Sequence, residues 1–291
     1  MKFHTTNRCA SKYSIFALPC LILFSLLFAF SLSVNAQYLV KNREALHPPI
    51  KVDETSKVER SGKVESIRDS ESLEVQSATE ADVSSLVYKP DEAPFGISYG
   101  NWGAYWWQWA MSIPASIHPG SLDRKISGAN AQLGQAGPVY FFSPNYQGTT
   151  SESEFLVPAD RAIFFPVYTV GFFFAPSDTI EGFLRRADED ANFIVNNVNK
   201  IWVEIDHQPV PETSIVRARS RLFSTNLPKG NVFEPFGLHQ GVYPSSAEGY
   251  YIMIKPLSPG THVIKTAASH NFGFSTHSEF YICVTDYAER N

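Results

Sequence analysis

The distribution of apolar residues divides the chain into three parts. A mainly apolar run without any charged residue, 15–34, follows a short basic start. Residues 37–94 carry twenty charged groups and only scattered apolar side chains, so this part buries too little apolar surface to offset the entropy of ordering it. From Phe95 onward aromatic residues become frequent. We therefore expect a removable leader over 1–36, a disordered acidic segment over 37–94 and a single β-rich globular domain over 95–291.

Two segments of the folded part show the spacing of amphipathic helices. Residues 98–113 place these apolar residues on one helical face: Trp102, Trp106, Trp109 and Ile113. Ser98 is a suitable N-cap for this helix, and Pro114 ends it. Residues 178–200 carry a second apolar stripe, which opens with Asp178 as a capping residue. We expect the tryptophan stripe to pack on a sheet.

The remaining apolar segments have the character of strands. Residues 139–142 and 162–170 are apolar at nearly every position and rich in aromatic and β-branched side chains, as buried strands are. The final third alternates apolar and polar residues in short segments separated by turns: 201–205, a short strand after the turn at 206–209, 250–254, 261–266 and 278–284. We predict a mainly β fold with a few helices, namely an antiparallel, jelly-roll-like β-sandwich with two helices packed on it.

The start of the chain has the organisation of a secretory signal. The basic residues Lys2, Arg8 and Lys12 precede the apolar run, and Val34-Asn35-Ala36 suits a signal peptidase that cleaves before Gln37. The competing interpretation is an uncleaved anchor, because roughly 20 apolar residues are enough to span a bilayer. We expect cleavage, a secreted or periplasmic protein, and no membrane span in the mature chain.

Charge narrows the choice of partners. The chain has 24 basic and 29 acidic residues, and three of the basic ones lie in the signal, which leaves a mature net charge of −8. Nucleic acids and anionic membrane surfaces attract basic proteins, so we expect no nucleic-acid partner.

The tryptophan helix is one of several short motifs. Residues 102–109 read WGAYWWQW, residues 137–141 read GPVYF, residues 163–167 read IFFPV and residues 257–262 read LSPGTH. Together these motifs resemble a family of exported bacterial and archaeal proteins of unknown function, and the likeness extends over about residues 100–285. The resemblance implies export and a β-rich fold, and it carries no established activity to particular residues.

The folded part contains none of the common catalytic motifs. The histidines show neither HxH nor HExxH spacing, and GxSxG, GxGxxG and Walker sequences are absent. We therefore expect no metal site and no cofactor, although folding could bring His270 and His277 close to His262. A carboxylate pair for glycoside hydrolysis needs no fixed spacing, and its candidates are Asp123, Glu154, Glu204 and Glu248.

Trp107 is the main candidate for a ligand surface. It lies about 100° from the helical face that its neighbouring tryptophans share, so we expect it to be less buried. An exposed indole offers a flat apolar surface and one N–H donor, whereas the alternative is that Trp107 covers a loop or a second sheet. We add His118, Asp123 and His262 as polar candidates for the same ligand-binding set.

We expect an exported, non-enzymatic protein that binds a glycan, an envelope component or a protein partner. One alternative is a secreted hydrolase whose site is assembled from separate loops. Another is a structural protein without a small ligand, which a wholly buried tryptophan cluster would favour. The sequence leaves the oligomeric state open.

Overall fold

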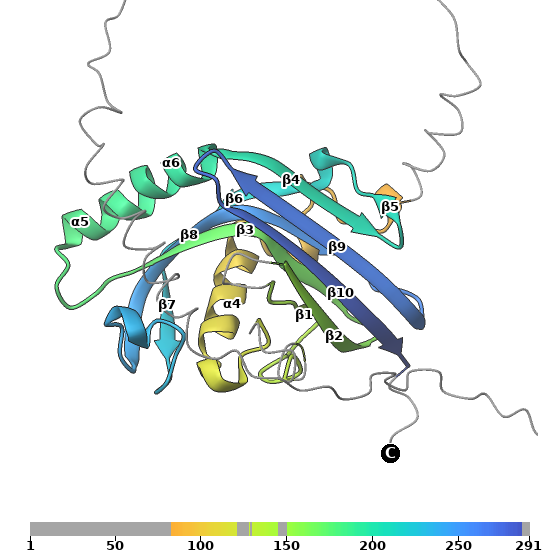
Figure 1. Ribbon diagram of the computed structural model, residues 1–291, viewed down its shortest axis with the longest axis horizontal. Helices are drawn as coiled ribbons and strands as arrows, with labels where there is room; N and C mark the ends of the chain where they lie inside the picture. Colours follow the sequence, from red (N-terminus) through yellow and green to blue (C-terminus); the bar gives the residue numbers. More distant parts are fainter. Residues whose placement is uncertain (1–82, 121–127, 129, 145–149, 287–291) are drawn as a thin grey trace, which may run out of the picture. The chain divides into compact units, whose positions relative to one another are not determined.

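The folded chain contains two open β-sheets that face each other (Figure 1). The computed structural model describes residues 83–120, 128, 130–144 and 150–286. Sheet A, with the order β1-β3-β8-β6 and β7 also paired to β8, consists of β1 (Val139–Phe141), β3 (Ala162–Phe173), β6 (Val216–Arg219), β7 (Phe223–Leu227) and β8 (Gly241–Ile254). Sheet B, with the order β2-β10-β9-β4-β5, consists of β2 (Thr150–Pro158), β4 (Val198–Ile205), β5 (Gln208–Pro209), β9 (Gly260–His270) and β10 (Ser275–Thr285).

This arrangement confirms the predicted mainly β, sandwich-like fold with helices. One part of the prediction is wrong, because the sheets are mixed and not antiparallel throughout. β1 pairs with β3 in parallel, and β10 pairs with β2 in parallel. β2 and β3 follow each other along the chain but belong to different sheets, so each takes neighbours from distant parts of the chain. Alternation of apolar residues predicts the strands but carries no information on which strand lies beside which.

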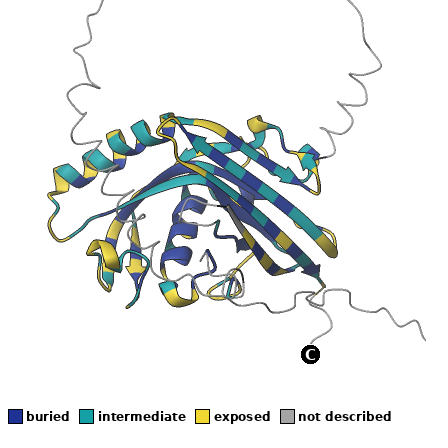
Figure 2. Cartoon of the chain, in the orientation of Figure 1, coloured by how far each residue is buried: buried dark blue, intermediate teal, exposed yellow. Residues whose placement is uncertain are grey.

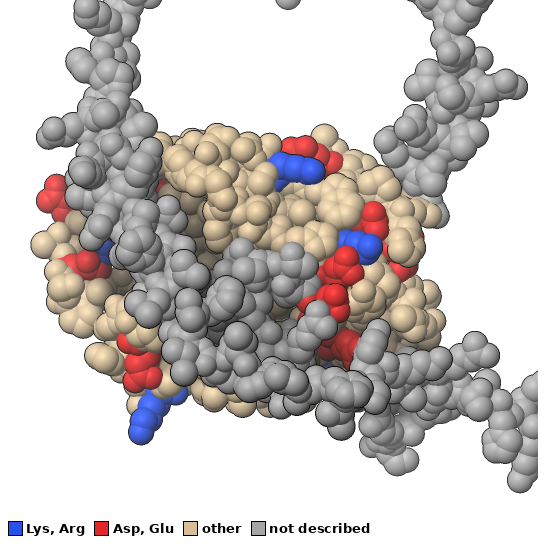
Figure 3. Space-filling model, in the orientation of Figure 1, with Lys and Arg blue, Asp and Glu red and all other residues tan. Residues whose placement is uncertain are grey.

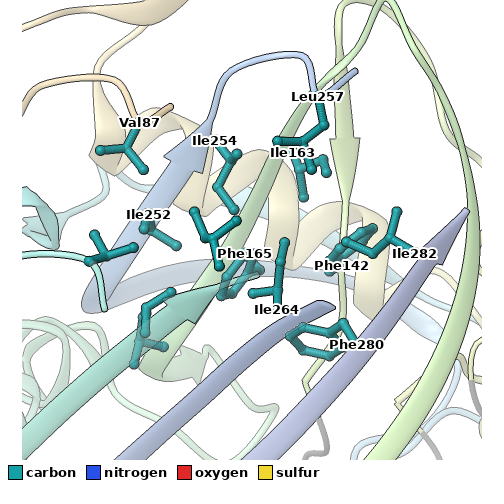
Figure 4. Packing of buried hydrophobic residues seen from close by; sticks show 14 of the residues in the cluster. Val87, Phe142, Ile163, Phe165, Ile252, Ile254, Leu257, Ile264, Phe280 and Ile282 are labelled. Atoms are coloured by element: carbon teal, nitrogen blue, oxygen red, sulfur yellow. The ribbon is translucent and has the colours of Figure 1, made fainter. Parts of the chain in front are cut away.

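Sheet A is buried on both faces. Along β3, Ile163 and Phe165 point into the core between the sheets, whereas Phe164 points into a second core on the other side. β8 alternates in the same way, with Ile252 in the first core and Tyr251 in the second. Figure 4 shows the first core, where side chains from both sheets meet. Burial on both faces explains why β3 is apolar at nearly every position. It also corrects the expectation that residues 250–254 of β8 alternate with polar ones, because these residues are apolar at every position and contribute to both cores.

Helix α4 (Tyr99–Met111) covers the face of sheet A that points away from sheet B (Figure 1). Ser98 caps it as predicted, because its Oγ accepts a hydrogen bond from the backbone N–H of Asn101 at 3.4 Å. Buried residues occupy most of α4, and they alternate with partly exposed residues along sheet B (Figure 2). The helix therefore lies inside the folded part and not on its surface.

The second predicted helix is present as three consecutive pieces. These are α5 (Ile180–Arg185), a π-helical turn over Arg186–Asp190 and α6 (Ala191–Asn196). Its N-cap is Thr179 and not the predicted Asp178, because Thr179 Oγ1 accepts the N–H of Gly182 at 3.0 Å. Asp178 instead accepts the N–H of Ala175 at 2.7 Å. Both predicted helices therefore exist, and both pack on the sheets.

A buried carboxylate attaches this second helix to sheet A. Glu248 on β8 is 4% exposed and accepts hydrogen bonds from Arg217 Nε at 3.0 Å and from Arg219 Nε at 2.8 Å. Arg219 also pairs with Asp188 in the π turn, and Arg217 donates to Asn192 Oδ1 in α6 at 2.8 Å. The two arginines therefore bridge the sheet and the helix, and they compensate the buried charge of Glu248.

The core begins before Phe95. Val83 and Val87 are both 2% exposed and belong to the core between the sheets, and Val87 forms a β-bridge with Ile254. The predicted signal and most of the predicted acidic segment lie outside the described residues. Within the described part of the chain, no helix combines the length and the apolar character that crossing a membrane requires.

Candidate functional site

Trp107 is buried almost as fully as the other tryptophans of α4, which agrees with the alternative that it packs against another part of the fold. Its side chain is 8% exposed, and its Nε1 donates to Thr169 Oγ1 at 3.2 Å. The ring contacts Phe173 edge-on and lies so close to Gly171 that a Cβ there would approach it to 2.8 Å. Trp107 therefore packs against the end of β3 in sheet A, the sheet that α4 covers, and these contacts bury it.

The other tryptophans of α4 are also structural. Their indole N–H groups all donate to backbone carbonyls: Trp102 to Pro94 at 3.1 Å, Trp106 to Phe142 at 2.6 Å and Trp109 to Leu133 at 2.7 Å. Each of these bonds ties α4 to a different segment of the chain. A buried indole whose donor is satisfied has no free polar group for a ligand. The tryptophan cluster is therefore buried, and its hydrogen bonds tie α4 to three other segments of the fold.

His118 is a buried side chain that bonds to the carboxyl end of α4. It is fully buried, its Nε2 donates to the carbonyl of Ala110 at 3.0 Å, and its Nδ1 accepts the N–H of Gly120 at 3.0 Å. Burial lowers the pKa of His118 to about 4, because a charged ring loses its hydration there. A neutral ring with both nitrogens occupied is a structural group.

His262, the other predicted polar residue with a described position, does not join His118. His262 lies in sheet B, with Nδ1 2.7 Å from Asp206 Oδ2 and Nε2 2.9 Å from the carbonyl of Ser258. Asp123 lies outside the described residues. Sheet A separates α4 and His118 from sheet B, so the structure does not bring the histidine pair together.

The carboxylates predicted for a hydrolase are also dispersed. Glu154 is exposed on β2 of sheet B, Glu204 lies on β4, and Glu248 is buried in sheet A between two arginines. His270 is buried beside α6, far along β9 from His262, so the possible histidine cluster is not formed. Within the residues that the structure describes, no group of three or more His, Cys, Asp or Glu side chains is arranged to hold a metal ion.

Exposed aromatic rings gather instead at the turn between β9 and β10. Phe272 is 41% exposed and Phe274 is 37% exposed. Phe272 stacks on Phe193 of α6 with 5.7 Å between ring centroids, and Phe274 contacts Tyr168 of β3 at 6.4 Å. We call this set, together with His270, the aromatic tip: Tyr168, Phe193, His270, Phe272 and Phe274. In Figure 1 the turn lies beside the end of α6.

Backbone hydrogen bonds hold the aromatic tip in one conformation. Gly273, with a φ of 82°, supplies the left-handed residue that the turn needs. The N–H of His270 donates to the carbonyl of Phe274 at 2.8 Å, and the N–H of Asn271 donates to the carbonyl of Asn197 at 2.8 Å. The second bond ties the turn to the end of α6. The two exposed phenylalanine rings therefore project from an ordered support.

His270 bonds to the carboxyl end of α6 in the same way as His118 bonds to that of α4. It is 5% exposed, its Nε2 donates to the carbonyl of Ile194 at 2.8 Å, and its Nδ1 accepts the N–H of Phe272 at 3.2 Å. Its ring also lies 4.3 Å from the ring of Phe272. Burial lowers the pKa of His270. His270 therefore links α6, through Ile194, to the exposed turn, through Phe272.

The outward face of sheet B carries a row of charged residues from four strands. Glu152, Glu279, Lys265 and Glu204 are neighbours across β2, β10, β9 and β4. Lys265 Nζ lies 3.6 Å from Glu279 Oε1. The hydrogen bond from Tyr281, together with His277 and Lys265, holds the pKa of Glu279 below its ordinary value. In Figure 3, acidic side chains gather over this part of the surface.

The sequence contains one indication of the aromatic tip, which an analysis of helix and strand periodicity does not detect. Residues 271–274 read NFGF, which places two phenylalanines around the glycine of a turn. Turns are usually polar, so aromatic residues there are candidates for a binding surface. Predicting the cluster also requires Phe193 and Tyr168, which only the fold brings to the turn.

Comparison with known proteins gives no family for the chain. No protein-family model and no curated protein matches it. The structure of PbICP-C in complex with falcipain-2 is 11% identical with a TM-score of 0.23, and the match covers 51% of this chain and 100% of that chain. The cysteine protease inhibitor EhICP2 from Entamoeba histolytica is 14% identical with a TM-score of 0.19, over 47% and 97% of the two chains. InlP from Listeria monocytogenes is 14% identical with a TM-score of 0.14, over 47% and 25%. At these TM-scores the likeness assigns neither fold nor function.

Proposed function

We propose that the protein is exported and binds a protein partner through the aromatic tip. The observation that carries this proposal is the projection of Phe272 and Phe274 from an ordered turn, with 41% and 37% of their surfaces exposed. Aromatic side chains dominate the binding energy of many interfaces, and a support that is already ordered lowers the entropy lost on binding. The apolar run and cleavage motif at the start of the chain support export.

The chemistry of the aromatic tip favours a protein over a glycan. Sugar-binding surfaces combine a flat ring with polar groups that read the hydroxyls. Phe272 and Phe274 have no polar atom in their side chains. The neighbouring amides of Asn199, Asn271 and Asn197 are already bonded to one another, at 2.8 Å for the first pair and 3.3 Å for the second. An apolar pocket on a protein is the better complement to such a surface.

Binding is also favoured over hydrolysis by the positions of the predicted chemical groups. The described candidates for acid, base or nucleophile roles lie in different parts of the fold, and His118 is sealed inside it. Hydrolysis needs such groups within hydrogen-bonding reach of one substrate. A purely structural role remains as the alternative, and the experiment below separates it from binding.

The test is a crosslinking experiment with the mature chain and the exported fraction of its source organism. A photoreactive phenylalanine analogue replaces Phe274, and the crosslinked species is identified by mass spectrometry. The same analogue at Phe236 is the matched control, because Phe236 is 38% exposed but lies in a turn before β8. Affinity for the identified species is then measured for the wild type, Phe272→Ala and Phe236→Ala.

We expect one defined species to crosslink at Phe274 and not at Phe236. The substitution Phe272→Ala should weaken its binding about 30-fold, as the loss of a central aromatic contact does, and Phe236→Ala should have no effect. Equal crosslinking at both positions, or equal affinities for all three proteins, would refute the proposal and favour a structural role. A glycan array with the same variants covers the sugar alternative, which gains if binding to a glycan is lost in Phe272→Ala alone.

A further inference from the structure

We infer that the aromatic tip is a pH-dependent surface, ordered when His270 is neutral and released when His270 takes up a proton. The inference rests on the proposed function, because it describes how binding at the aromatic tip is regulated. It follows from the position of His270, which lies under Phe272 and is bonded both to α6 and to the turn itself.

The two hydrogen bonds of His270 can form together only in one neutral tautomer. Nε2 must carry the proton that it donates to the carbonyl of Ile194, and Nδ1 must be bare to accept the N–H of Phe272. A protonated ring carries a hydrogen on both nitrogens. Its Nδ1–H would then face the N–H of Phe272. Because both groups are donors, the hydrogen bond between them would be lost.

Among the described residues, the groups that His270 meets carry no charge that would stabilise the protonated ring in place. On β3 it faces Tyr168, with 6.0 Å between ring centroids, and burial raises the pKa of Tyr168 to about 12, so that this group stays neutral. On α6 it meets the carbonyl of Ile194, and on β4 its strand neighbour is Val198. The ion pairs found among the described residues do not include His270. The charged ring must therefore leave its place to reach water.

Movement of the ring would remove the support of Phe272. The ring of Phe272 lies between His270, at 4.3 Å, and Phe193, at 5.7 Å. Once its N–H has lost its acceptor, the Phe272 ring keeps the stack on Phe193 but loses its contact with His270, while the backbone bonds of His270 and Asn271 still close the turn. The partner would then meet a turn that must be ordered during binding, which lowers the affinity. Binding at neutral pH and release at acid pH follow.

The experiment is an NMR titration of the full mature chain without a partner, from about pH 7.5 to about pH 4.5, a range that covers histidine titration. Ring resonances report the protonation of His270, and hydrogen exchange of the Phe272 amide reports the order of the aromatic tip. We expect the protection factor of this amide, which already accounts for the intrinsic pH dependence of exchange, to fall about tenfold as His270 titrates. His118→Gln is the matched control, because it removes a histidine with the same two hydrogen bonds at the other helix.

The response should persist in His118→Gln and disappear in His270→Gln, in which an amide that does not titrate replaces the ring. If His270→Gln does not fold, coincidence of the two midpoints in the wild type still decides the question. A Phe272 amide whose protection stays constant while the His270 ring titrates would overturn the inference. Because this readout needs no partner, its failure is distinct from failure of the proposed function, which the crosslinking at Phe274 tests at neutral pH.

Discussion

Acidification should destabilise the fold through His118, and the size of the effect follows from its burial. The ordinary histidine pKa is 6.5, and burial lowers it to about 4 in the folded chain. Between these values the unfolded chain takes up a proton that the folded chain rejects, so stability falls as the pH falls. Stability is therefore highest above the unfolded pKa, decreases down to about pH 4 and then levels off. The full difference corresponds to about 3 kcal/mol of unfolding free energy.

The assay is urea unfolding of the wild type and His118→Gln at about pH 7 and about pH 4.5, where His118 should account for about 2 kcal/mol of the change. The variant should lose stability at neutral pH, since Ala110 and Gly120 each lose a bonded group, but its pH dependence should be smaller by this amount. His207→Gln is the control, because that side chain is 78% exposed. If the unfolding free energy of the wild type and of His118→Gln depended equally on pH, the assignment of His118 as a buried neutral histidine would be refuted.

Three further substitutions test other contacts of the fold. Glu248→Ala should lower the unfolding free energy by about 3 kcal/mol, because it leaves two arginines without their shared carboxylate; a loss below about 1 kcal/mol in urea unfolding would contradict this. Gly103→Ala places a Cβ 2.8 Å from the ring of Tyr251, so overpacking of about 1–3 kcal/mol should exceed the gain in helix propensity of about 1 kcal/mol, and a raised thermal midpoint would argue against it. Lys265→Glu should destabilise by up to about 1 kcal/mol at low salt and much less at high salt, because it puts a further carboxylate beside Glu279; equal effects at both salt concentrations would exclude a charge effect.

Many elements of the fold could be predicted from local sequence because each has a period of its own, whereas β2, β6 and β7 were not predicted. The tryptophan spacing in 98–113 led to α4, observed over Tyr99–Met111, and the alternation in 278–284 led to β10, observed over Ser275–Thr285. The pairing of β10 with β2 was not predictable in this way. This pairing joins residues more than a hundred positions apart, and the sequence of neither strand indicates which strand lies beside it.

The candidate site was less predictable because exposure depends on what surrounds an element. A helical wheel gives the direction of Trp107 correctly, about 100° from the other tryptophans, but it assumes that α4 has one covered side. Trp107 faces sheet A itself, where Thr169, Gly171 and Phe173 of β3 cover it, so the direction that the wheel took as open is a buried one. The aromatic tip shows the opposite case. Phe272 and Phe274 lie in the turn between β9 and β10, where they stay 41% and 37% exposed although they are apolar.

At His118 and His270, burial has a larger effect on the pKa than the helix dipole has. The carboxyl end of a helix favours a positive charge by about 0.3–1 kcal/mol, and up to about 2 kcal/mol in partly buried sites. His118 and His270 both bond to carbonyls in the last turn of a helix, yet the pKa of each is lowered, because desolvation of a charged ring outweighs this attraction. A histidine placed there can donate to the helix only while neutral. Protonation should therefore weaken both contacts by the same chemistry, with the stability of the fold reporting on His118 and the order of the aromatic tip reporting on His270.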